Sequence, residues 1–170
     1  AVTGTDATFT VKANDKAAAT FTGSSKITLD KAVIELSAHN GKGTAAAKGA
    51  TVTAQTITLN SGSLTTSATS TADADASGRG AAKLEASSGA MTLGSAATYV
   101  DGTNYKVVDK PAQAFDITSD ADTTVSASGA LTYNAGTVKN SAKLTLKTTA
   151  GAVTVHKDVA FAGNTGTIEI

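Results

Sequence analysis

The chain has 170 residues, a formal charge of zero at pH 7, no cysteine, no tryptophan and only 4% aromatic residues. A neutral chain without a run of Lys or Arg argues against nucleic-acid binding, because phosphate recognition needs a basic surface. Lack of cysteine excludes disulfides and cysteine-ligated metals, and no apolar stretch approaches the roughly 18 residues of a membrane-spanning helix.

The first strand is predicted over residues 7–13, where apolar and polar residues alternate as they do in a strand with one buried face. Two uses compete for it. It is either an internal strand of its own domain or an exchanged strand, extended to 2–13, that completes a neighbouring copy. The subunit-interface residues of such an exchanged strand would be Val2, Ala7, Phe9, Val11 and Ala13.

A local partner for this strand follows at once in the sequence. Residues 19–22 repeat the Ala-Thr-Phe-Thr of residues 7–10, and Asn14-Asp15 lies between the two copies. Asn and Asp favour turns, so the repeat predicts an antiparallel hairpin with Phe9 and Phe21 on one face.

The rest of the chain consists of short runs with strand preference, bounded by Gly, Asn, Asp and Ser, and it shows no helical period. We therefore expect an all-β fold, an antiparallel β-sandwich of immunoglobulin-like or Greek-key-like type with many short strands. The strongest hairpin signal is an Asp-Gly turn within residues 97–108, which Pro111 ends because proline lacks a ladder donor. The other runs are 26–29, 32–36, 50–59, 115–117, 123–125, 131–133, 143–147, 152–156, 159–162 and 167–170.

A Ser-Gly turn followed by a small residue, a large apolar residue and threonine occurs at 61–65, 88–92 and 128–132. The unequal spacing of the three copies favours reuse of one turn chemistry over a repeat architecture, since regular solenoids need a fixed period. A β-solenoid is therefore the minor alternative.

Residues 67–80 contain no large apolar side chain, so we expect a flexible loop there. A single domain over 1–170 is expected, with two lobes, 1–66 and 81–170, as the alternative. Asp73, Asp75 and Ser77 match the first half of an oxygen-ligand calcium loop, but the closing acid is misplaced by one residue. Calcium is thus a weak candidate, and no other cofactor or metal is expected.

The sequence contains no motif typical of a catalytic site. His39 and His156 have many serines available, but no Gly-x-Ser-x-Gly elbow presents a nucleophile. We expect no enzymatic activity and no catalytic residues. Lys–Asn isopeptide bonds remain open, with Lys12, Lys26 or Lys143 and Asn140 or Asn164 as the available groups.

The Ala/Thr/Gly/Ser-rich composition and the hairpin-like segments 99–108 and 131–136 resemble prokaryotic extracellular surface-filament subunits, namely pilin-type β-sandwiches and the outer domains of flagellins. The resemblance implies a structural subunit of a filament, pilus or surface layer that polymerises with identical subunits by strand exchange. A start at Ala-Val-Thr fits a processed secreted chain, so we expect a cell-surface or extracellular location. The alternative is a monomeric adhesin or virion-decorating β-sandwich that acts as a binding module.

Overall fold

The structure is a computed structural model that describes the whole chain except residues 15, 24, 42–46, 71–77 and 104. The described residues form sixteen β-strands and no α-helix. The strands are β1 (Val2–Lys12), β2 (Ala19–Thr22), β3 (Lys26–Asn40), β4 (Ala50–Ala54), β5 (Thr56–Leu59), β6 (Gly62–Ser70), β7 (Ala81–Ala86), β8 (Met91–Leu93), β9 (Thr98–Asp101), β10 (Lys106–Lys110), β11 (Phe115–Ser119), β12 (Asp122–Ala127), β13 (Leu131–Asn140), β14 (Leu144–Thr148), β15 (Val153–Phe161) and β16 (Ile168–Glu169).

Strand direction overturns the expected antiparallel β-sandwich. Among the described strands every pairing is parallel except that of β9 with β10. The all-β prediction is confirmed, but the immunoglobulin-like or Greek-key-like arrangement is wrong. Short alternating runs between turn residues are compatible with either strand direction, so the pattern carried no information about it.

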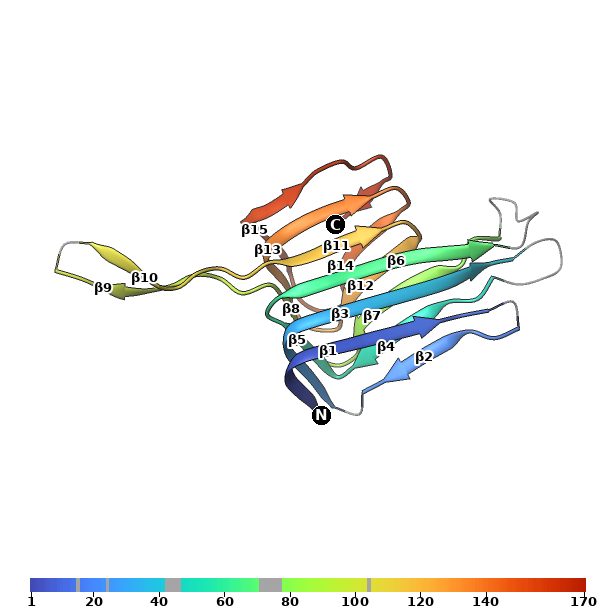
Figure 1. Cartoon of the computed structure of the whole chain (residues 1–170), viewed down its shortest axis with the longest axis horizontal. Coiled ribbons are helices and arrows are strands. Elements are labelled where there is room, and N and C mark those ends of the chain that lie inside the picture. Colours follow the sequence, from blue (N-terminus) through green and yellow to red (C-terminus); the bar gives the residue numbers. More distant parts are fainter. Residues whose placement is uncertain (15, 24, 42–46, 71–77, 104) are drawn as a thin grey trace.

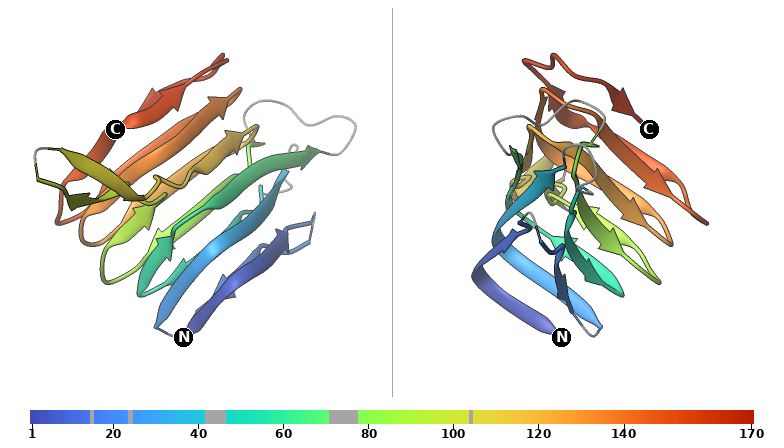
Figure 2. Two further views of the ribbon diagram at one scale, coloured as in Figure 1. Left: turned by 60° about the vertical axis from the view of Figure 1, so that its left-hand side comes forward. Right: turned by 90° about the vertical axis from the view of Figure 1, so that its right-hand side faces the viewer.

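The chain winds into six stacked coils, and each coil adds a rung to both parallel sheets (Figures 1 and 2). The larger sheet is built around β1, β3, β5, β6, β8, β11, β13 and β15, and the smaller sheet runs in sequence order through β2, β4, β7, β12, β14 and β16. This arrangement is a β-solenoid. Hydrogen-bonded positions in successive coils are separated by 25 residues at Thr10 and Glu35, 30 at Asp30 and Asn60, 40 at Gly94 and Asn134, and 21 at Ser128 and Thr149.

The larger sheet is creased along one line, which gives each coil three sides. β3 crosses the crease, whereas the next coil is divided there into β5 and β6 and the following one into β8 and β11. We name the side that contains β5 and β8 face 1 and the side that contains β6 and β11 face 2. Gly62 (φ 121°) and Gly94 (φ 67°) lie at the crease, where a side chain would be strained, and a Cβ on Gly62 would collide with the backbone of Ala32.

The core lies between the three sides and consists of apolar columns that run along the stack. On face 1, parallel register superposes Ile27, Ile57, Met91 and Leu131, all of them buried. In the smaller sheet Val52, Leu84, Val125 and Leu146 form an equivalent column. Because each buried side chain has a neighbour in the coil above and below, the columns fill the interior continuously.

The first two strands do not form the expected hairpin. β1 pairs in parallel with β3, and β2 pairs in parallel with β4 on the opposite side of the interior. Phe9 and Phe21 do meet, with ring centroids 4.9 Å apart, but they approach from different sheets. Their contact is therefore part of the core of the first coil.

The hairpin within residues 97–108 is confirmed. β9 and β10 are antiparallel, with Tyr99 opposite Val108, and Pro111 follows the last residue of β10. This hairpin is inserted between β8 and β11 and projects from the stacked coils, at the left of Figure 1. We call residues 95–113 the arm. Of the loop expected over 67–80, β6 takes up residues as far as Ser70, and 71–77 lie outside the described residues.

Candidate assembly interface

The strand proposed as the subunit interface lies at one end of the stack. β1 forms the edge of the larger sheet and is hydrogen-bonded to β3 along its length, from Val2 opposite Ile27 to Lys12 opposite Ser37. The structure thus places this strand in its own chain.

The predicted interface residues form two groups by burial. Val11 and Ala13 are only 8% and 7% exposed, whereas Val2, Ala7 and Phe9 are partly buried. All five point toward the interior, but a residue in the first coil has a stacked neighbour on one side only. The incomplete burial of Val2, Ala7 and Phe9 therefore reflects their position at the end of the stack.

The opposite end carries a matching set of apolar side chains that the sequence analysis did not identify. Val153, Val155 and Ile168 are partly buried, while Phe161 is 44% and Ile170 68% exposed. Register places Val153 on Leu131 and Phe161 on Val138, so both continue interior columns. These residues can be recognised as members of interior columns only when the strand register is known. The unequal lengths of the coils hide that register in the sequence.

Both ends expose sheet edges as well as apolar columns. β1 and β2 are edge strands at one end, and β15 and β16 are edge strands at the other. In the described part of the chain no helix or strand covers these edges. Solenoids normally carry terminal units with a polar outer face, and uncovered edges invite pairing with another chain.

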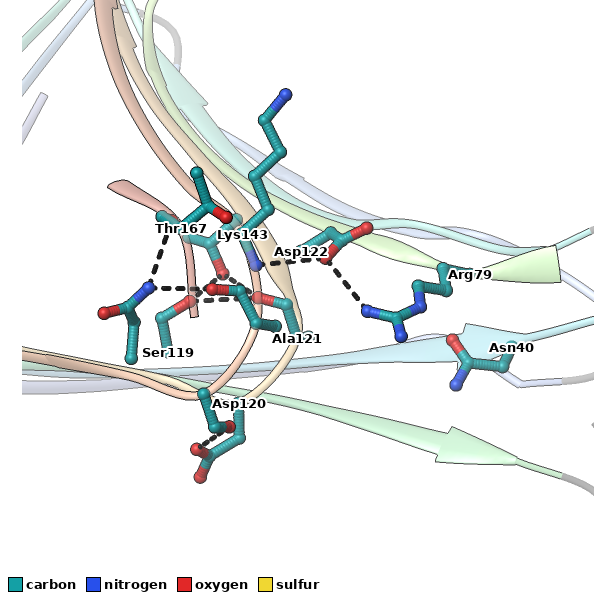
Figure 3. Close-up of polar contacts among 12 residues, drawn as sticks. Asn40, Arg79, Ser119, Asp120, Ala121, Asp122, Lys143 and Thr167 are labelled. Atoms are coloured by element: carbon teal, nitrogen blue, oxygen red, sulfur yellow. Dashed lines mark hydrogen bonds and ion pairs between the residues drawn. The ribbon is translucent and has the colours of Figure 1, made fainter. Parts of the chain in front are cut away.

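Buried polar groups gather where face 2 turns into the smaller sheet (Figure 3). The Ser119 hydroxyl donates to Thr123 Oγ1 at 2.9 Å and to the Ala121 carbonyl at 2.9 Å, while Thr66 and Thr123 share a hydrogen bond of 2.7 Å. Asn140 Nδ2 donates to the carbonyls of Ala142 and Thr167. These contacts satisfy backbone groups at a turn, so we assign the cluster to the fold and not to catalysis.

The two aspartates of this corner point in different directions (Figure 3). Asp120 accepts a hydrogen bond from Ser141 at 2.7 Å, whereas Asp122 accepts from the Lys143 amide and lies 3.7 Å from Arg79. The weak calcium candidates Asp73, Asp75 and Ser77 lie outside the described residues. Within the described ranges, no three His, Asp or Glu side chains are grouped as a metal site would require.

The other candidate groups have ordinary structural partners. His39 Nδ1 lies 3.2 Å from Thr69 Oγ1, and His156 is on the exposed side of β15. Lys143 Nζ is 2.8 Å from Glu169, which makes an ion pair. Thr69 Oγ1 donates its proton to the Ala38 carbonyl at 3.3 Å, so the His39 contact does not activate this hydroxyl as a nucleophile.

The arm creates two further surface features. Its strands are exposed on both faces, with Tyr99, Val100, Tyr105, Val107 and Val108 all accessible. At its base is a cleft of about 500 Å³ against the crease. Most of the residues that line the cleft are of polar type, among them Asp30, Lys31, Asn60, Lys110 and Gln113, and Asn60 donates to Asp30 at 2.7 Å.

Comparison of the chain with protein-family models, with curated proteins and with solved structures finds no match. Within the described residues there is no helix with the length and apolar character needed to cross a bilayer. Among the described residues, the two ends of the stack, with their uncovered strand edges and apolar side chains, are the most distinctive surfaces.

Proposed function

We propose that this protein is a structural, non-enzymatic subunit of an extracellular filament or surface layer, and that identical copies assemble through the ends of the solenoid. One observation carries the proposal: within residues 1–170 the apolar interior columns run to the first and last coils, whose apolar side chains are only partly covered. An assembly by edge pairing replaces the earlier expectation of an exchanged strand in a sandwich.

The energetics favour covering these ends. Complete burial of a Val, Ile or Phe side chain contributes about 1.5–3 kcal/mol, and each end carries several such side chains that are only partly covered. Pairing of edge strands would also give the free backbone N–H and C=O groups of these strands hydrogen-bond partners in another chain in place of solvent. A contact between two different ends does not close on itself, so repeated association produces a fibre.

The test compares two Lys substitutions at apolar residues of equal exposure. Phe161, on the terminal coil, is 44% exposed, and Val107, on the arm, is 45% exposed. We expect the unmodified protein to form fibres or lattices visible by electron microscopy. Phe161→Lys should raise the concentration needed for assembly at least tenfold, because the charge would be buried in the joint.

The control Val107→Lys should assemble like the unmodified protein. Thermal unfolding followed by circular dichroism verifies that both variants are folded. A protein that sediments as a monomer at every concentration tested, or an equal response to the two substitutions, would contradict the proposal.

The arm supports a second candidate function, that of a monomeric binding module such as an adhesin or a domain that decorates a virion. Its exposed tyrosines and valines have the amphipathic character common at protein interfaces. The same pair of variants separates the two functions. A binding module would remain monomeric, and target binding would respond to Val107→Lys but not to Phe161→Lys.

A further inference from the structure

We infer that copies join head to tail, with β15 and β16 of one copy pairing in parallel with β1 and β2 of the next, in the register that already joins coils within the chain. This inference rests on the proposed end-to-end assembly and specifies its geometry.

The register follows from columns that run through the whole molecule. Val2 lies opposite Ile27 at one end, and Val153 lies opposite Leu131 at the other, and Ile27 and Leu131 belong to the same face 1 column. Continuing that column across a joint superposes Val153 of one copy on Val2 of the next. The outward neighbours then place Thr154 on Thr3, which extends a column with threonine in every coil, namely Thr3, Thr28, Thr58, Thr92, Thr132 and Thr154.

Side-chain size is complementary across this joint. The same register superposes Val155 on Gly4 and Val159 on Ala7 along the larger sheet. A Cβ at Gly4 would meet only Leu29 Cδ2, at the ordinary van der Waals distance of 3.9 Å, so nothing crowds this position. At these two positions a valine of the last coil meets a glycine or an alanine of the first, which favours close packing.

The smaller sheet shows the same relation. Ile168, at the C-terminal end, would superpose on Ala19. On face 2, Phe161 would superpose on Phe9, whose ring already contacts Phe21. The joint would therefore bury an aromatic cluster of Phe9, Phe21 and Phe161.

A head-to-head joint does not preserve these columns. Turning one copy over reverses the sense in which the chain runs around the stack, so the meeting strands would be antiparallel. Only one of the three sides could then meet its own counterpart, and face 1 of one copy would lie over the smaller sheet of the other. Head-to-tail stacking is the arrangement that continues all three sides.

Two carboxylates of like charge meet at the joint. The register brings Asp158 of one copy opposite Asp6 of the next. Lys157 Nζ already lies 3.1 Å from Asp158, and its flexible side chain can reach between the two carboxylates. Asp6 in turn lies opposite Lys31 of its own chain, so each of the two carboxylates has a lysine as a neighbour.

The test uses disulfide cross-linking in a chain that has no cysteine of its own. Thr8 and Ala160 are exposed, point outward and become direct neighbours only across the inferred joint. Paired strands lie about 4.8 Å apart, within the Cα separation that a disulfide spans. Oxidation of the assembled Thr8→Cys/Ala160→Cys variant should give a ladder of covalent oligomers on a gel, which collapses to monomer on reduction.

Three variants serve as controls. Thr8→Cys/Val33→Cys joins neighbours of the same face within one chain, so it should form an intramolecular disulfide and verify the geometry. Thr8→Cys/Ala162→Cys is displaced by two residues along the strand and should cross-link at least tenfold less. Thr8→Cys alone should give no covalent dimer.

Failure of the inference is distinguishable from failure of the proposed function. If fibres form but the Thr8→Cys/Ala160→Cys ladder is absent, the register is wrong while end-to-end assembly stands. If the single Thr8→Cys variant gives dimers, the joint is head to head. If the unmodified protein forms no fibres, the assembly function itself fails before any cross-link is made.

Discussion

Tyr133 combines a polar group with complete burial. Its side chain has no exposed surface, and its hydroxyl donates to the Phe115 carbonyl at 2.5 Å, beside the crease between faces 1 and 2. Burial, and to a smaller extent the nearby Asp116 carboxylate, raises the pKa of Tyr133 far above the ordinary tyrosine value of about 10. The folded protein therefore holds this phenol in its neutral form.

This raised pKa makes stability depend on pH in the alkaline range. Above about pH 10 the unfolded chain releases the Tyr133 proton and the folded chain retains it, so the unfolded state is favoured as pH rises. We expect the free energy of unfolding to be insensitive to this group below about pH 10. Above that value it should fall with a slope approaching about 1.4 kcal/mol per pH unit.

Urea unfolding at a series of pH values checks this expectation. Tyr133→Phe should remove the alkaline slope and cost about 1 kcal/mol at neutral pH, because the Phe115 carbonyl loses its donor. Tyr105→Phe, a change at an exposed ring, serves as the control and should retain the slope. Identical alkaline profiles for the unmodified protein and Tyr133→Phe would show that the slope has another source.

At this scale the sequence predicts which residues are apolar and inward but not where they lie. Phe9, Val11 and Ala13 were expected to share a buried face, and all three do point inward. Phe9 and Phe21 were expected to be neighbours on one sheet, and they meet from two. Alternation fixes the side of a strand on which a residue lies, whereas the opposing strand depends on the whole topology.

Among the elements, the arm has the least connection to the core. β9 and β10 contain no buried residue, and the arm begins where Ser95 and Gln113 exchange two backbone hydrogen bonds of 2.9 and 3.0 Å. Its two ends are therefore already adjacent and paired. The coils on either side continue in register across the insertion, with Leu93 opposite Leu59 and Phe115 opposite Gly62.

Replacing residues 96–112 with Asn-Gly should leave the solenoid intact. A two-residue turn of this type closes an antiparallel pair, and the two strands that are removed contribute no buried side chain to the core. We expect the thermal midpoint to change by less than about 2 °C.

Leu84→Ala, a truncation in the core, provides the contrasting variant and should cost about 2–5 kcal/mol. Circular dichroism melts compare the two. A loss of stability from the shortened arm as large as that from Leu84→Ala would show that the arm supports the fold.

The elements also show where sequence reasoning succeeds. The β9–β10 hairpin could be predicted because its turn residues and both strands lie within a dozen positions. Elsewhere the same reasoning expected sequence neighbours such as β1 and β2 to pair, and they do not. Parallel pairing joins segments one coil apart, and no local residue pattern identifies such partners.

At the scale of the whole molecule, the recurring Ser-Gly motif could be seen in the sequence, but the period of the coils could not. The Ser-Gly motifs at 88–92 and 128–132 occupy the same place in successive coils, with Met91 opposite Leu131 and Thr92 opposite Thr132. The arm accounts for the length of the coil between them. The motif at 61–65 lies instead on face 2, so the three copies could not show one period.

Only one of the two ends of the candidate interface could be predicted from the sequence, again because the register of the coils is hidden. The β1 end could be named because a strand near residue 7 has a plain alternating pattern. The β15 and β16 end could not, since Phe161 is recognisable as a column residue only when the register to Val138 is known. A sequence alignment of coils would need the insertions to be removed first.

The parallel stacking also determines how the molecule would respond to mechanical load. Figure 2 shows the two termini at opposite ends of the stack, and the described strands of each coil pair only with strands of the neighbouring coils, the β9–β10 hairpin apart. A pull between the termini is directed along the stacking axis, so the coils bear the force in series, and each coil can detach from its neighbour separately because its contacts are only with adjacent coils.

Force spectroscopy should then record a series of small extensions in place of one large event. Coils separated by 21 to 25 residues would each release about 70–90 Å of extended chain. A single rupture that releases the whole chain would contradict this view. In an end-to-end assembly the same geometry would make the protein an extensible material, which yields stepwise under tension and regains its length by rewinding.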